Sequence, residues 1–246
     1  MKNKLVILFL GCAFLSYAQK KEAKKTVKIK PRSEFVSELM SKMTVDEKIG
    51  QLNLPTSGDI TTGAANSSNV AKNIEEGKVG GLFNIKGVDK IRAVQKIVVE
   101  NSRMKIPLLF GMDVIHGYNT VFPIPLGVSC IWDMATVQKS ARVAAIEASA
   151  SGINWTFSPM VDISRDPRWG RISEGSGEDV FLSVEIAKAR VLGFQGDDLT
   201  ATDTVLACAK HYAVHSGPEW SRHQLNLNNV DPRDLYETYL PAFKAV

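Results

Sequence analysis

The feature that most constrains the fold is an alternation of short apolar segments with segments of helical periodicity. The short segments have the length of strands and are bounded by turn-forming residues, whereas the longer ones carry apolar residues three or four positions apart. Strand followed by helix, repeated, indicates parallel strands joined by crossover helices. The expected strands are residues 79–85, 107–113, 155–158 and 205–209, and the expected helices are 89–103, 133–152 and 180–194, with others beginning at 33, 44 and 231.

Capping residues mark several helix starts. Thr44-Val-Asp-Glu47 has the pattern of a capping box. Asp89, Asp133 and Asp231 each precede or open an expected helix and are expected to cap it. The stretch Val114–Ile131, with two prolines, is interpreted as a loop.

Polar residues fall where the expected strands end. Asp113 ends one strand, a charged loop follows residues 155–158, and Lys210 and His211 follow residues 205–209, which lack alternation and suggest a strand buried on both faces. A (β/α) barrel places its active site at these strand ends. A doubly wound sheet does so too, but the chain has no G-x-G-x-x-G or P-loop pattern. We therefore predict an α/β fold of the (β/α)8 TIM-barrel type, of which the chain holds an incomplete N-terminal part with about five strands, the first uncertain.

The loop within Trp155–Asp179 is unusually long and charged for a strand-to-helix connection. Its arginines offer planar sets of donors for carboxylates or paired hydroxyls, and Trp169 offers a flat apolar face. Together these side chains suit a polyhydroxylated ring such as a sugar. From residue types alone, a loop that is only braced by its own salt bridges is an equal alternative.

The first 32 residues form two segments that differ from the rest. Residues 1–18 combine Lys2 and Lys4, an apolar run too short to span a bilayer, and small residues at 16 and 18, which predicts a signal peptide cleaved before Gln19. Lipidation at Cys12 is the minor alternative. Residues 19–32 are basic and poor in apolar side chains, which is typical of a disordered tail. We expect a periplasmic or secreted protein with no membrane association after cleavage.

The charge of the chain is unevenly distributed. Residues 1–32 hold nine Lys or Arg and one Glu, whereas the remainder holds 21 basic and 25 acidic residues, a net charge of −4. The folded part therefore gives no indication of a nucleic-acid partner. Cys130 and Cys208 remain after signal cleavage, and their spacing suggests no metal site, although a single disulfide between them stays open.

Six motifs occur in order along the chain. They are Gly111-Met-Asp-Val-Ile-His-Gly117, Thr120-Val-Phe-Pro123, Ser158-Pro-Met-Val-Asp162, Arg165-Asp-Pro-Arg-Trp-Gly-Arg171, Ser173-Glu-Gly-Ser-Gly-Glu-Asp179 and Ala209-Lys-His-Tyr212. They resemble the N-terminal domain of glycoside hydrolase family 3, a (β/α)8-type barrel, and most of all its secreted bacterial β-glucosidases. The resemblance covers nearly all of residues 33–246, which we expect to be one such domain.

The resemblance implies substrate-binding roles at subsite −1. Asp113 would accept hydrogen bonds from sugar hydroxyls, and Arg171, Lys210 and His211 would hold the remaining hydroxyls. Arg222 stands near a further basic position of the family. His116, Glu174, Glu178 and Asp179 are interpreted as packing, bracing or capping residues.

The resemblance also implies what the chain lacks. Family members are retaining enzymes that use a nucleophilic carboxylate and an acid/base carboxyl group. The nucleophile is an Asp in a Ser-Asp-Trp-like motif, which does not occur here, and the acid/base Glu comes from a following α/β domain. We therefore expect no catalytic residue within this chain, which would end before the nucleophile and be inactive alone, and we expect no cofactor and no metal.

Alternative functions remain open at this point. An N-acetylglucosaminidase branch uses an Asp-x-His dyad, but the corresponding positions here are Ser221 and His223. A β-xylosidase is suggested by the segment Lys210–Glu219. A Schiff-base lyase would use Lys210 as its nucleophile. A non-catalytic sugar-binding protein would need only the binding residues.

Overall fold

A computed structural model describes residues 30–56, 70–216 and 230–246. The chain divides into two compact units, Met1–Lys42 and Met43–Val246. In the first unit, helix α1 (Arg32–Lys42) begins within one residue of the expected start, and Glu38 forms ion pairs with Lys30 and Lys42. The predicted signal peptide and most of the basic tail lie outside the described residues.

The second unit is built on a small parallel sheet. Its strands are β1 (Gly81–Phe83), β2 (Leu109–Met112) and β3 (Trp155–Thr156), and their order in the sheet follows the order in the chain. Parallel bridges extend the sheet at both edges, from Thr56 to Phe83 and from Trp155 to Leu206. Five successive segments thus lie side by side in chain order, as the strands of a (β/α) barrel do.

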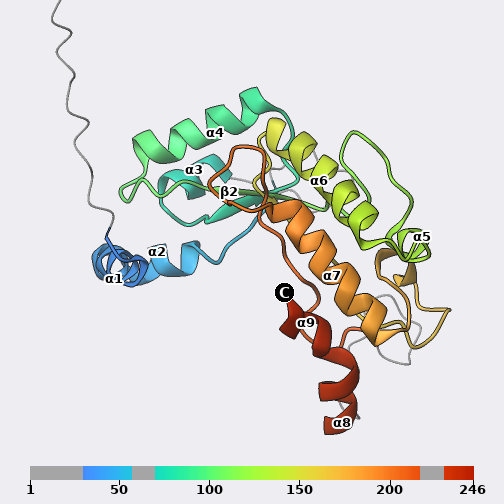
Figure 1. The fold of residues 1–246 in the computed structure, drawn as a ribbon. Helices are drawn as coiled ribbons and strands as arrows, with labels where there is room; N and C mark the ends of the chain where they lie inside the picture. The colour runs from blue at the N-terminus through green and yellow to red at the C-terminus, as the bar shows by residue number, and fades with distance from the viewer. Residues whose placement is uncertain (1–29, 57–69, 217–229) are drawn as a thin grey trace, which may run out of the picture. The chain divides into compact units, whose positions relative to one another are not determined.

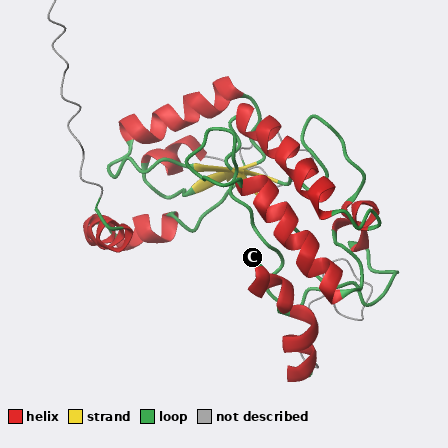
Figure 2. Ribbon diagram, viewed as in Figure 1, coloured by secondary structure: helices red, strands yellow, loops and turns green. Residues whose placement is uncertain are grey.

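Helices connect these strands and cover the sheet (Figure 2). The elements are α2 (Val45–Gly50), α3 (Val70–Glu75), α4 (Val88–Asn101), α5 (Pro125–Ser129), α6 (Met134–Ala150), a 3-10 turn η1 (Ile172–Glu174), α7 (Val180–Gln195), α8 (Pro232–Asp234), a π-helical turn η3 (Leu235–Tyr239) and α9 (Pro241–Ala245). The largest apolar cluster joins β1 and β2 to α4 and α6 through fully buried side chains such as Leu82, Phe110 and Ala145.

Helices α6 and α7 lie side by side (Figure 1). They can approach closely because small residues line their contact. A side chain at Gly193 would place its Cβ 2.6 Å from the Cβ of Ala141. Only glycine allows the two backbones to approach so closely. On α6, Ala141, Ala144 and Ala148 are buried.

Most of the predicted helix starts are confirmed. Thr44 and Glu47 form the reciprocal hydrogen bonds of a capping box at α2. The carboxylates of Asp133 and Asp231 accept hydrogen bonds from the first turns of α6 and α8. Asp179 caps α7 in the same way, in agreement with the capping role considered for it.

Three local predictions were wrong. Asp89 does not cap α4, because the helix begins one residue earlier, after Gly87, and Asp89 falls inside its first turn. The stretch Val114–Ile131 contains helix α5, whose Pro125 occupies the first turn, where the missing N–H costs nothing.

The third error concerns residues 205–209, which do not form a continuous strand buried on both faces. Leu206 is 36% exposed, and the segment pairs with its neighbour only at isolated bridges. The pairing instead changes register at Ser158 and Pro159, whose carbonyls accept from the N–H groups of Cys208 and Lys210.

Candidate functional site

The carboxyl ends of two separate strand segments meet in an ion pair. Nζ of Lys210 lies 2.7 Å from Oδ1 of Asp113. The Lys210 side chain is 13% exposed, whereas that of Asp113 is 43% exposed. Asp113 follows β2 and Lys210 follows the segment that pairs with β3, so the parallel topology brings them together. The carboxylate keeps lone pairs facing solvent and available to a ligand.

Arg171 lies at the centre of a second set of contacts. Its Nε and Nη2 donate to the two carboxylate oxygens of Glu174 at 2.6 and 2.7 Å. Its Nη1 lies 3.1 Å from Nε2 of His211 and 3.3 Å from Nε2 of His215. Both members of the Arg171–Glu174 pair are largely buried. The charged loop after β3 is thus tied to the segment that carries Lys210.

The orientation of His211 is fixed by Asp162, which is buried. Nδ1 of His211 lies 2.8 Å from Oδ2 of Asp162, and the backbone N–H of His211 donates to the same carboxylate. A guanidinium N–H can only donate, so Nε2 of His211 must accept from Arg171 and Nδ1 must carry the proton. The tautomer of His211 follows from these two neighbours.

Arg171 and Glu174 stabilise each other's charged forms. The hydrogen bonds that Arg171 donates to Glu174 raise the pKa of Arg171. Burial acts to raise the pKa of Glu174, but the hydrogen bonds and charge of Arg171, together with the charge of Lys210, hold that pKa below its usual range.

A cavity of about 250 Å³ lies beside these residues. Asp113, His116, Gly117, Ile124, Ser173 and Glu174 are among the residues that line it. Its carboxylates can accept hydrogen bonds, and Lys210 stands behind Asp113 as a charged donor. Such an arrangement suits a small ligand with several hydroxyl groups.

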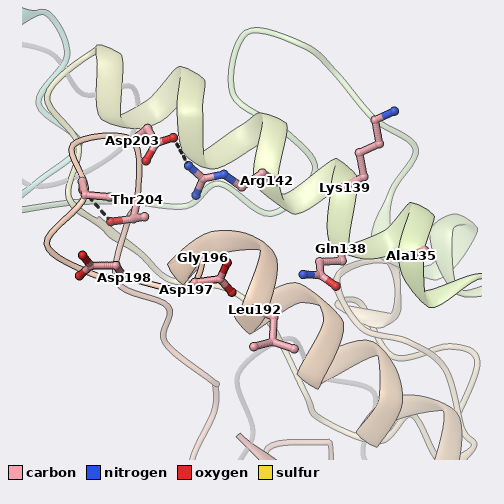
Figure 3. Close-up of a pocket in the computed structure, with 11 residues that line it drawn as sticks. Ala135, Gln138, Lys139, Arg142, Leu192, Gly196, Asp197, Asp198, Asp203 and Thr204 are labelled. Atoms are coloured by element: carbon pink, nitrogen blue, oxygen red, sulfur yellow. Dashed lines mark hydrogen bonds and ion pairs between the residues drawn. The ribbon is translucent and has the colours of Figure 1, made fainter.

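A larger cavity, of about 570 Å³, lies between α6 and the segment that follows α7 (Figure 3). Arg142 and Asp203 form an ion pair with each other there, as the dashed line shows. None of the predicted site residues lines this cavity. Because it holds none of the residues at the strand ends, it is a weaker candidate than the strand-end site.

Four of the five predicted site residues lie together in the structure. Asp113, Arg171, Lys210 and His211, hereafter the strand-end cluster, are joined by the contacts above. The fifth, Arg222, lies outside the described residues, as do Ser221 and His223. The binding roles of all five predicted site residues stay predictions.

Sequence reasoning missed or misread three other residues. Asp162 ends the segment after β3, which is the same signal that singled out Asp113. Glu174 does brace Arg171, as expected, but it also lines the cavity. His116 was expected to be a packing or second-layer residue, whereas it is exposed and lines the cavity.

Several simple features complete the description. Cys130 and Cys208 are free thiols, so they do not pair with each other. In the described part of the chain, no three His, Cys, Asp or Glu side chains gather as a metal site would require. No described helix is long and apolar enough to cross a membrane.

Parallel strands in chain order, joined by crossover helices and followed by charged side chains at their carboxyl ends, are the arrangement of a (β/α) barrel. Residues 44–246 match the model of the glycosyl hydrolase family 3 N-terminal domain. The chain belongs to glycoside hydrolase family 3, and its fold is the TIM-barrel-like α/β fold of that domain.

Individual relatives agree with this assignment. The chain is 41% identical to a periplasmic β-glucosidase of Salmonella typhimurium over 87% of its own length and 27% of the relative's. It is 40% identical to a xylan 1,4-β-xylosidase of Xylanibacter ruminicola over 53% of this chain and 17% of the relative. The crystal structure of a β-glucosidase from Listeria innocua in complex with isofagomine superposes with a TM-score of 0.77 at 40% identity, covering 87% of this chain and 30% of that one. The chain thus spans less than a third of the length of these relatives.

Proposed function

We propose that this chain supplies the sugar-binding part of a retaining β-glycosidase that removes terminal, non-reducing β-D-glucosyl residues. The observation that carries the proposal is the strand-end cluster, in which Asp113 and Lys210 form an ion pair beside Arg171 and His211. Relatives named as β-glucosidases support the same class of reaction.

The strand-end cluster would mainly stabilise the transition state of hydrolysis. Asp113 accepts hydrogen bonds from sugar hydroxyls, while Lys210 and Arg171 contribute positive charge near them. Hydrogen bonds to charged groups are about twice as strong as neutral ones. If they tighten as the ring flattens toward an oxocarbenium ion, they lower the barrier instead of merely improving binding.

The two catalytic carboxyl groups would come from outside residues 1–246. A retaining site needs them about 5–5.5 Å apart, flanking the scissile bond. In the described residues, Asp113 pairs with Lys210, Glu174 with Arg171 and Asp162 with His211, and we assign none of these three as the nucleophile. A later barrel strand and a following α/β domain would supply them, and the chain alone would be inactive.

Two alternatives are weaker. A Schiff-base lyase needs the Lys210 amine free to attack a carbonyl carbon, whereas Nζ of Lys210 donates a hydrogen bond to Asp113 at 2.7 Å. A non-catalytic sugar-binding protein would use the same cluster without turnover. Hydrolysis of a glycoside by the intact protein separates this second alternative from ours.

A β-xylosidase is the candidate closest to our proposal, and the Xylanibacter relative favours it. Xylose lacks the hydroxymethyl group of glucose, and a site that hydrogen-bonds that hydroxyl discriminates far better than an apolar pocket does. Asp113 is the carboxylate that we assign to that side of the sugar, so we propose glucoside as the main and xyloside as the secondary substrate.

The test uses the intact protein that contains this chain, with 4-nitrophenyl β-D-glucoside and β-D-xyloside as matched substrates. We expect a larger kcat/KM for the glucoside, and NMR of the first product should show the β-anomer. A larger kcat/KM for the xyloside would overturn the glucose assignment, and an α-anomer would overturn the retaining mechanism.

We also propose export to the periplasm or beyond, from the signal-like residues 1–18 and the periplasmic relative. N-terminal sequencing of the exported protein should begin at Gln19. An acylated Cys12 or an intact Met1 would contradict this proposal.

A further inference from the structure

Arg190 is a buried cation that the mechanism above does not use. It lies in α7 with only 6% of its surface exposed. Its Nη2 donates to the backbone carbonyl of Ile115 and, at 3.1 Å, to Oγ of Ser158. The guanidinium carbon lies 5.5 Å from the ring centroid of Phe194.

Burial of the Arg190 guanidinium, taken alone, lowers the stability of the folded state. Among the described residues no carboxylate forms an ion pair with Arg190, and its Nε has no hydrogen-bond partner. Burial lowers the pKa of Arg190 to about 10. A well-packed apolar side chain at a buried charged position is often neutral or stabilising. The two acceptors of Nη2 therefore point to a role for the guanidinium beyond packing.

Both acceptors lie just behind the strand-end cluster. Ile115 follows Asp113 by two residues, so its carbonyl belongs to the same turn of chain. Ser158 follows β3, and its carbonyl accepts a hydrogen bond at 3.0 Å from the backbone N–H of Cys208, two residues before Lys210. One nitrogen of Arg190 thus connects the three segments that end at Asp113, Asp162 and Lys210.

The loop after β2 has a second attachment, which differs in character. The exposed carboxylate of Glu147 accepts hydrogen bonds from the backbone N–H groups of Asn119 and Thr120, at 2.8 Å each. That contact fixes the far end of the loop at the surface. Two buried contacts, in contrast, hold the chain next to Asp113: the one through Arg190, and the hydrogen bond that the Val114 N–H donates to Oγ1 of Thr156 at 3.3 Å.

We propose that Arg190 is a positioning residue, which sets the spacing between Asp113 and Lys210 by holding Ile115 and Ser158. This inference rests on the proposed glycosidase function for its kinetic consequences but not for its structural ones. Without Arg190, the carbonyl of Ile115 loses its buried donor, and the turn that carries Asp113 can shift relative to Lys210. A misplacement of such a binding group by an ångström can cost a hundredfold in rate.

The kinetic test measures kcat/KM of the intact protein for 4-nitrophenyl β-D-glucoside at a temperature well below unfolding. Arg190→Met should lose at least tenfold, and Arg190→Lys, whose ammonium can still donate, should lose less. Arg142→Met is the matched control, because Arg142 is a partly buried arginine of the adjacent helix α6 that pairs with Asp203 away from the site. It should lower the melting temperature with less than a twofold change in kcat/KM.

A double-mutant cycle asks whether Arg190 acts through Asp113. The combined loss of Arg190→Met and Asp113→Asn should be clearly smaller than the product of the two single losses. Losses that multiply, or an Arg190→Met variant within twofold of wild type, would overturn the proposal. If Arg190→Met does not fold, Arg190→Lys and Arg190→Gln complete the same cycle with the same criteria.

A second measurement does not depend on the reaction. Amide hydrogen exchange in the peptide 113–122 should accelerate in Arg190→Met, accelerate less in Arg190→Lys and stay unchanged in Arg142→Met. Unchanged exchange in this peptide would overturn the positioning role even in an active enzyme. Conversely, a wild-type protein that hydrolyses no glycoside refutes the proposed function, while accelerated exchange would still support the role of Arg190.

Discussion

Lys210 and Asp113 are 97 residues apart in the chain, yet their side chains form an ion pair with Nζ 2.7 Å from Oδ1. Each stands at the carboxyl end of its own strand segment, and parallel pairing puts these ends on one edge of the sheet. Lys210 is the more buried partner, so the ammonium is fixed while the carboxylate faces the solvent. The pair is therefore preorganised to receive a ligand on its Asp113 side.

Arg171→Lys should impair the site although the charge is kept. A lysine cannot donate in parallel to both oxygens of Glu174 and also reach His211. We expect a loss of at least tenfold in kcat/KM for the aryl glucoside, or ~1.4 kcal/mol.

The control for that variant is Arg168→Lys in the same loop, because Arg168 is 70% exposed and, among the described residues, pairs with Asp166. It should change kcat/KM by less than twofold. Equal losses in the two variants would mean that Arg171 has no special role.

Asp162→Asn should disturb His211. The amide keeps one acceptor oxygen, but its NH2 group places a donor where the second carboxylate oxygen now accepts from the backbone N–H of His211. We expect the native state to lose about 1–3 kcal/mol and kcat/KM to fall as His211 reorients. Thermal unfolding and the ¹⁵N shifts of the His211 ring measure the two effects. Ring shifts that still report the Nδ1–H tautomer in the variant would show that Asp162 does not fix it.

Strands β1, β2 and β3 could be predicted because each forms part of a short apolar segment that a polar residue follows in the sequence. Asp113, Lys210 and His211 were found in this way, since topology alone brings strand ends together. Asp162 carried the same signal and could have been found too.

Other features depend on packing that no local pattern encodes. The contact from Arg190 to the Ile115 carbonyl joins a helix to a distant loop, and its buried position in α7 resembles any other core position. The cavity-lining role of Glu174 depends on how the loop folds back after Arg171. The prolines of Val114–Ile131 were interpreted as loop signals, although proline at a helix start is equally common.

The capping box at α2 should make stability depend on pH. The hydrogen bond from Arg103, then that from the Thr44 backbone, lowers the pKa of Glu47 from 4.5 to about 2. Because the folded-state pKa lies below the unfolded one, Glu47 stabilises the fold above pH 4.5, and this contribution is lost as the pH falls toward 2. Glu47→Gln should cost about 1 kcal/mol at neutral pH.

The measurement is the melting temperature of the intact protein between pH 6 and pH 3, with and without Glu47→Gln. We expect the difference between the two proteins to shrink as the pH falls. Parallel curves would show that Glu47 is not ionised with a lowered pKa in the folded state.

The most direct test of the proposed sugar site is kcat/KM of the intact protein for 4-nitrophenyl β-D-glucoside, compared among wild type, Asp113→Ala and Lys210→Ala. Each substitution removes a charge-assisted contact that should strengthen in the transition state. We predict turnover by the wild type and a loss on the order of a hundredfold, ~2.7 kcal/mol, in each variant. A change below about tenfold in either variant, with the protein still folded, would contradict the assignment of that residue to the site.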